Sequence, residues 1–112
     1  MKFLILMSND EAAWGALAPA EQARVLEAHA VCQGELRAAG QFLASWRLRP
    51  ASEALTVVRD AAGSTRTRAG AGVGALLGGA YLLDVPSRDE ALRWAQRLRF
   101  IAGENEVREV WE

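Results

Sequence analysis

The stretch PAEQARVLEAHAVCQGELRAA, residues 19–39, organises the predicted fold because it reads as one long amphipathic helix. Pro19 suits a first helical turn, where its missing N–H has no cost, and Gly40 supplies a stop. One face of this helix repeats at steps of three and four and carries Val25, His29, Cys32, Leu36 and Ala39. The only histidine of the chain therefore lies in a mainly apolar stripe that must pack on another layer.

Short apolar stretches before and after this helix predict five strands, over residues 2–8, 41–48, 54–59, 80–85 and 106–111. The first has apolar residues on both alternating faces, which is typical of a central strand that is covered on both sides. Along the second, the alternation places Phe42, Ala44, Trp46 and Leu48 on one face. These stretches indicate a sheet with one strand at its centre.

Two further helical segments are expected, one short and one of ordinary length. Residues 8–10, Ser-Asn-Asp, end the first strand and can cap a short turn over residues 12–17. Ser87 and Glu90 form a capping box after Pro86 and open the other helix. Its predicted inner face carries Ala91, Leu92, Ala95 and Leu98, with Trp94 at the edge. Residues 63–79 are rich in glycine and are predicted to form one long loop.

The order strand, helix, strand, strand, strand, helix, strand predicts an α+β fold. We expect a ferredoxin-like antiparallel sheet with two helices on one face. The apolar character of both faces of residues 2–8 leaves the opposite face of the sheet without cover. A second copy of the same sheet is the simplest cover, so a homodimer is expected.

The bulk composition limits the possible classes of function. The chain has 112 residues, which suits one domain over residues 1–112, and 13 basic residues against 14 acidic ones. This balance argues against nucleic acid and anionic membranes as partners. The apolar run of residues 3–7 is too short for a signal peptide, and the single Cys32 excludes an internal disulfide. We therefore expect a soluble, cytoplasmic protein.

Several segments resemble the YCII-related family, in the branch also called DGPF-domain proteins. They are MKFLILM followed by EAAW, then ELRAAG, then LGGAYLLDVPSRDEALRWA over residues 77–95, and the closing EVREVW. The resemblance covers nearly the whole chain. It implies a ferredoxin-like fold that dimerises sheet to sheet into an α/β barrel, with a pocket between the sheet and the helices. It also implies that an enzymatic activity, where a member has one, is lyase-like or dehalogenating.

The sequence departs from the family pattern in two places. The Asp-Gly-Pro-Phe signature of the branch is lost, because residues 67–70 read Thr-Arg-Ala-Gly. His29 falls at the position of the family histidine on the first long helix. The aspartate that usually accompanies it is replaced by about Leu98, with Arg99 beside it. The sequence therefore keeps only the histidine of the acid–base pair that the resemblance implies.

His29 is the main candidate for chemistry. Either it is a general base or hydrogen-bond donor in the pocket, or it is a helix histidine that packs against the sheet. Cys32, one turn further on the same face, is either a thiol activated by His29 or, more often for such a position, a small buried hydrophobe. A metal site built from these two residues and Asp10 lacks further ligands, so no metal is expected.

Aromatic residues are the candidates for substrate binding. Trp14, Trp46 and Tyr81, together with Cys32, are predicted to wall a pocket for an apolar ligand, although plain core or dimer packing is the alternative. Trp94 and Trp111 are assigned to packing. Glycines 70, 72 and 74 lack the following helix of a nucleotide fingerprint, so no cofactor is expected.

Three functions remain open at this point. The first is a homodimer that binds a hydrophobic organic molecule between the sheet and the helices. The second is a cofactor-independent enzyme of the same shape, of the lyase, isomerase or cyclase type, with His29 as general base. The third is a regulatory partner that acts through its dimer surface or its glycine-rich segment.

Overall fold

The computed structural model describes residues 1–112 and has an α+β fold. Its sheets are built from β1 (Lys2–Ser8), β2 (Phe42–Arg47), β3 (Leu55–Arg59), β4 (Thr65–Ala69), β5 (Leu77–Asp84) and β6 (Asn105–Glu109). Its helices are α1 (Glu11–Ala16), α2 (Pro19–Ala38), α3 (Arg88–Arg97) and the short 3-10 turn η1 (Ala51–Glu53). No helix is long and apolar enough to cross a membrane.

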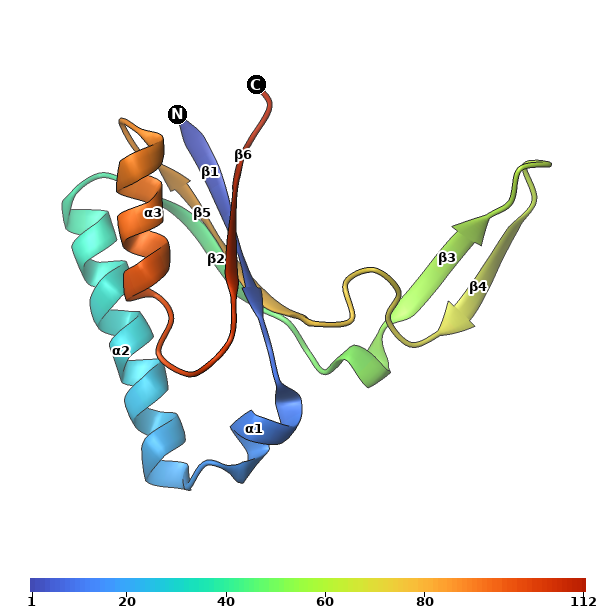
Figure 1. Cartoon of the computed structure of the whole chain (residues 1–112), viewed down its shortest axis with the longest axis horizontal. Coiled ribbons are helices and arrows are strands. Elements are labelled where there is room, and N and C mark those ends of the chain that lie inside the picture. The colour runs from blue at the N-terminus through green and yellow to red at the C-terminus, as the bar shows by residue number, and fades with distance from the viewer.

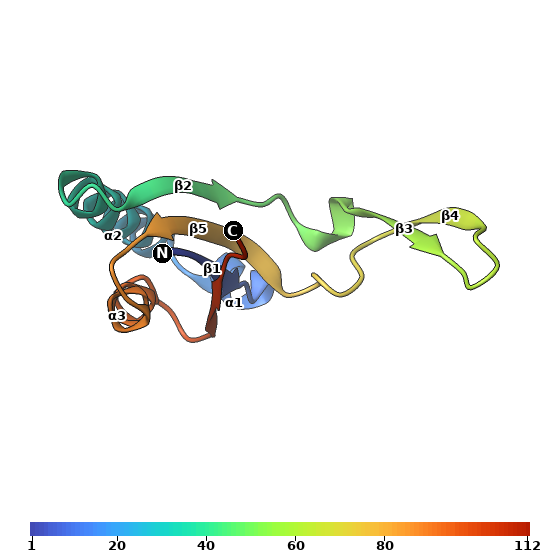
Figure 2. The ribbon, with the colours of Figure 1, turned by 90° about the horizontal axis from the view of Figure 1, so that it is seen from above.

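Four strands form an open antiparallel sheet in the order β2-β5-β1-β6. The long α2 connects β1 to β2, and α3 connects β5 to β6, so the two helices lie on the same side of the sheet (Figures 1 and 2). This is the ferredoxin-like arrangement, and the expected central position of the first strand is confirmed. The two termini lie side by side, where Val110 N–H donates to Lys2 O.

The hydrophobic core lies between the sheet and the two helices. Its centre consists of side chains from alternate positions of β1 and β5, which point toward the helices because side chains alternate across a strand. The buried core side chains are Phe3, Ile5, Cys32, Leu36, Tyr81, Leu83, Val85, Ala91, Trp94, Ala95 and Leu98. Of the five residues in the predicted helical stripe, Cys32 and Leu36 are buried, Val25 and His29 are half-buried, and Ala39 is exposed.

The predicted helix ends are confirmed by their capping geometry. Pro19 stands in the first turn of α2, and Gly40 follows its last residues with a positive φ of 69°. Glu90 N–H donates to the Ser87 hydroxyl at the start of α3. The predicted inner face of α3 was wrong at two positions. Trp94 is buried and donates to Gln41 Oε1, whereas Leu92 is exposed.

The predicted alternation along β2 was also wrong, because a bulge interrupts the strand between Phe42 and Ala44. Phe42 pairs with Leu83 on the helix-covered face, and its ring contacts Tyr81. Beyond the bulge, Trp46 pairs with Ala80 on the opposite face and is largely exposed. An extra residue in a strand shifts every following side chain to the other face, which alternation in the sequence does not reveal.

The glycine-rich segment is not one loop. Thr65–Ala69 forms β4, which pairs with β3, and β5 begins at Leu77. The resulting two-stranded arm, residues 55–69, projects away from the main sheet (Figure 1). Leu55 and Val57 are exposed on it. The arginines and threonines of β4 concealed this strand in the sequence, because a polar strand lacks an apolar alternation.

The second face of the four-stranded sheet has no covering layer in one chain (Figure 2). We call it the open face. The register of the strands determines which side chains lie on the open face. At the centre of this face they are almost all apolar. They are Leu4, Leu6, Ala44, Trp46, Ala80 and Leu82, with Glu106 and Arg108 at the β6 edge. Trp111, which the sequence assigned to packing, is also almost fully exposed.

Candidate functional site

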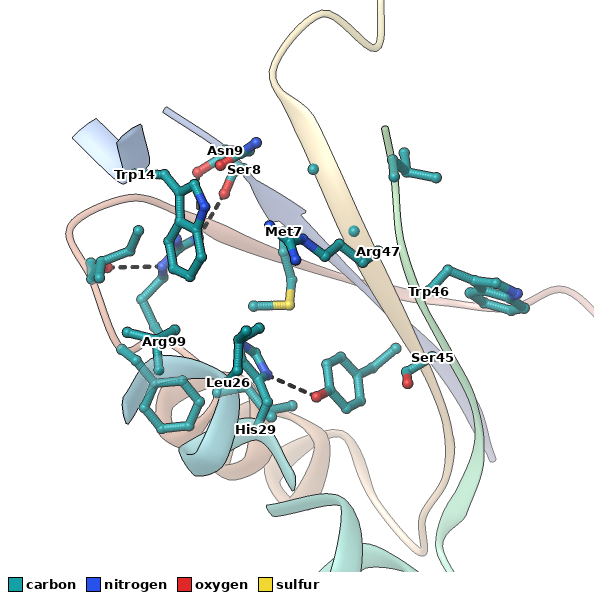
Figure 3. A pocket seen from close by; sticks show the side chains of 18 of the residues that line it. Met7, Ser8, Asn9, Trp14, Leu26, His29, Ser45, Trp46, Arg47 and Arg99 are labelled. Carbon is teal, nitrogen blue, oxygen red and sulfur yellow. Dashed lines mark hydrogen bonds between the residues drawn. The ribbon is translucent and has the colours of Figure 1, made fainter. Parts of the chain in front are cut away.

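A cavity of about 430 Å³ opens between the sheet and the N-terminal half of α2. Its walls come from β1, α1, α2, β2, β5 and the segment that follows α3 (Figure 3). Apolar side chains such as Met7, Leu26 and Phe100 alternate with a few polar groups. A largely apolar cavity with convergent polar groups is the usual form of a small-molecule site.

His29 lies on the wall of this cavity, and its ring is held between Tyr81 and Phe100. A hydrogen bond of 2.8 Å joins its Nδ1 to the Tyr81 hydroxyl. Gln33 Nε2 donates to the same hydroxyl oxygen at 3.0 Å. The rings of Phe100 and His29 pack in a T-shaped arrangement, with their centroids 4.8 Å apart. The imidazole therefore has a fixed orientation and a polar partner, and it faces an open cavity.

The surroundings of this pair favour neutral side chains. Burial lowers the pKa of His29 below its usual 6.5, and the positive charge of Arg99 lowers it further. Burial likewise raises the pKa of Tyr81 above its usual value. At neutral pH the imidazole is uncharged, so it can accept a proton or a hydrogen bond.

Arg99 is the second polar feature of the wall, and backbone oxygens hold it. Its Nε donates to Ile101 O at 2.9 Å, and its Nη1 donates to Glu104 O at 2.9 Å and to Ser8 O at 3.1 Å. The Nη1 group also reaches Asn105 Oδ1. Partial burial lowers the pKa of Arg99, and no carboxylate forms an ion pair with it.

Gly103 makes room for this guanidinium. Its φ of 150° is one that other residues rarely adopt. A Cβ at this position would lie 2.9 Å from Arg99 Cζ and from Ser8 Oγ. The loop between α3 and β6 is thus shaped around the arginine side chain, which fixes the cation on the cavity wall.

The predicted aromatic walls are only partly brought together. Trp14 and Tyr81 both line the cavity, and the guanidinium of Arg47 lies over the Trp14 ring at 5.4 Å from its centroid. Trp46 lies next to the cavity through its strand, but its side chain points away from it (Figure 3). The bulge in β2 is the reason, because it turns Trp46 onto the open face.

Cys32 lies in the core and does not line the cavity. Burial raises the pKa of its thiol, which disfavours the thiolate. Its nearest polar contact is Arg97 Nη2, at 3.9 Å. Asp10 instead caps α1 by accepting from Ala13 N–H. The structure therefore does not bring these two residues to His29.

Sequence reasoning missed Gln33 as a partner in the site and gave Arg99 no role there. Gln33 follows His29 by one helical turn, and this spacing could have indicated that both reach the same acceptor. Arg99 follows Leu98, the C-cap of α3, but nothing local shows that its side chain turns back toward β1. Only the loop geometry that follows α3 reveals this.

The fold and the cavity define a ferredoxin-like α+β protein with a pocket that is lined by one histidine and two arginines. The sequence profile of the YCII-related domain family matches residues 1–112 of the chain. The protein therefore belongs to the YCII-related family. No curated protein is significantly similar to it in sequence.

Proposed function

We propose that this YCII-related protein is a cytoplasmic homodimer that binds a hydrophobic organic small molecule in the cavity between sheet and helices. The observation that carries the proposal is the cavity itself, about 430 Å³ in volume and walled largely by apolar side chains. Its volume lies in the range that holds drug-sized ligands. The single Cys32 is compatible with a reducing compartment.

Two exposed apolar surfaces support the homodimer. The open face carries Leu4, Leu6 and Leu82 at its centre, and these would be hidden if a second open face packed on it. The arm of residues 55–69 is a two-stranded hairpin, which is marginally stable in water without a packing partner. A sheet-to-sheet dimer, of the α/β barrel type that the family implies, would cover the open face.

Binding can be tested with the neutral fluorescent dye N-phenylnaphthylamine. Leu26 lines the cavity and is 46% exposed, whereas Val31 lies on the same helix away from the cavity and is 52% exposed. We expect Leu26→Asp to weaken dye binding about tenfold or more, equivalent to ~1.4 kcal/mol, and Val31→Asp to leave it unchanged. Equal affinities for the two variants, or no binding to the wild type, would contradict the proposal.

The second candidate is a cofactor-independent enzyme of the lyase, isomerase or cyclase type with His29 as general base. The observation that favours it is the neutral imidazole that faces the cavity with a hydroxyl 2.8 Å from Nδ1. In the tautomer with the proton on Nδ1, the ring donates to the Tyr81 oxygen and Nε2 is free to accept a proton. Tyr81 and Gln33 would then orient the base.

This candidate predicts proton exchange at carbon acids. A panel of unsaturated lactones and β-diketones would be incubated with the protein in D₂O, and deuterium incorporation would be followed by NMR. The enzyme version expects His29→Ala to lose an activity that Val31→Ala, on the outer side of the same helix, retains. If His29→Ala incorporated deuterium at an unchanged rate, His29 would not be a general base, and only the binding function would remain.

A further inference from the structure

The guanidinium of Arg99 is a cation on the cavity wall without a counter-ion. Its Nε and Nη1 groups donate only to uncharged oxygens, namely backbone carbonyls, the Ser8 hydroxyl and the Asn105 amide. No acceptor lies within hydrogen-bond distance of its Nη2 group, and no acidic side chain forms an ion pair with it. The Nη2 group of this partly buried cation is therefore left free to donate to an anion in the cavity.

The other charges of the cavity leave it positive. Arg47 adds a second guanidinium, which lies over the Trp14 ring. Glu11 is the one acidic side chain of the wall, and its Oε1 already accepts the Ala51 N–H at 2.8 Å. His29 is neutral, because both burial and Arg99 lower its pKa. Two cations therefore face one anion that is already engaged.

The cavity thus has a charged end and an apolar body. Arg99 and Trp14 lie at the end near Ser8, and Met7 and Leu26 lie between that end and the His29–Tyr81 pair (Figure 3). A ligand that fits this arrangement carries a negative group at one end and an apolar skeleton. Arginine is well suited to such a group, since its planar fork matches the two oxygens of a carboxylate.

We propose that the ligand of this pocket is an amphiphilic organic carboxylate whose acid group pairs with Arg99 while its apolar skeleton packs against Met7 and Leu26. This inference rests on the proposed binding function and names the chemical class of the ligand.

A carboxylate bound at Arg99 also changes the charge near His29. The titratable and charged groups around its ring are Tyr81 on β5 and Arg99 after α3, with Arg47 and Glu11 further along the wall. A carboxylate that neutralises Arg99 removes the repulsion that disfavours the imidazolium, so the pKa of His29 is higher with a bound carboxylate than with a neutral ligand of the same shape. The chain has one histidine, and a single imidazole NMR signal therefore reports this change.

The test compares naphthoate with its neutral amide, naphthamide, by calorimetry on the intact protein. We expect naphthoate to bind at least about tenfold more tightly than naphthamide, because only naphthoate can form a charge-assisted hydrogen bond with Arg99. Arg99→Gln should abolish this preference. Arg88→Gln, which changes the net charge equally at an exposed position outside the cavity, should keep it.

Because Arg99 also holds the loop after α3, Arg99→Gln can lose the fold, so a measurement on the wild type is needed as well. The pKa of His29 should be higher with naphthoate bound than with naphthamide bound, because the two compounds bury the ring alike and only naphthoate neutralises Arg99. If both compounds bind equally and give the same pKa of His29, the carboxylate inference is overturned while the binding function stands. If neither compound binds, both are overturned.

Discussion

The two faces of the four-stranded sheet differ in what they contact. On the helix-covered face, Ile5 and Leu83 are completely buried, and no buried side-chain nitrogen or oxygen lacks a hydrogen-bond partner. On the open face, Leu6 and Leu82 belong to the same two strands but have no layer above them. Alternate side chains of the same strand therefore lie either against the helices or on the open face. One chain therefore builds the cavity by itself, whereas the apolar side chains on its second face have no cover within that chain.

The largest effect is expected from the helix-covered face. Leu83→Ala removes a fully buried side chain and should lower the free energy of unfolding by about 2–5 kcal/mol, measured by urea denaturation. This loss should not depend on protein concentration. Leu82→Ala, its neighbour on the open face, should show a loss that grows with protein concentration, because it acts through the dimer. If both variants lost the same free energy of unfolding at every protein concentration, the predicted difference between the two faces would be wrong.

The next effect concerns association through the open face. Trp46 is 53% exposed in one chain, and Trp46→Glu places a charge where two sheets would meet. We expect the dissociation constant of the dimer to rise about thirtyfold or more, equivalent to ~2 kcal/mol, in sedimentation experiments. Leu92→Glu, at a 40% exposed leucine on α3, is the matched control and should leave the dimer intact. A wild-type protein that sediments as a single copy would refute the dimer.

A smaller effect should come from pH, and it belongs to the cavity. The pKa of His29 is lowered in the folded protein below its usual 6.5, so the unfolded chain binds this proton more readily. The contribution of neutral His29 to stability is complete above pH 6.5 and is lost as the pH falls toward the folded pKa. Urea midpoints of the wild type should therefore fall between about pH 7.5 and about pH 5.5 by more than those of His29→Gln. Parallel curves for the two proteins would show that His29 is not the group responsible.

The smallest effect is expected in the arm of residues 55–69. Val57 is 67% exposed there, and Val57→Ser should change the free energy of unfolding of a single chain by less than about 0.5 kcal/mol. Urea denaturation at low protein concentration measures this. A loss of more than ~1 kcal/mol under these conditions would mean that the arm packs on the rest of its own chain.

Local patterns were enough for most of the elements. The long helix follows from Pro19, the apolar stripe and Gly40, and the start of α3 follows from Ser87 and Glu90, because each signal acts within one or two helical turns. The sequence also placed His29 on the face that meets the sheet. It did not predict the bulge after Phe42 or the polar strand β4, because pairing with a distant strand determines both.

The order and type of the main elements, the ferredoxin-like class and the helix face of the histidine were determined by the sequence alone, since periodicity and capping are local properties. The composition of the cavity was decided only by the tertiary structure. Tyr81 and Gln33 meet at His29, and Arg99 meets Ser8, across 48 to 91 positions of chain. Contacts over such separations depend on how strands and loops pack. The periodicity of a short stretch of sequence therefore cannot predict them.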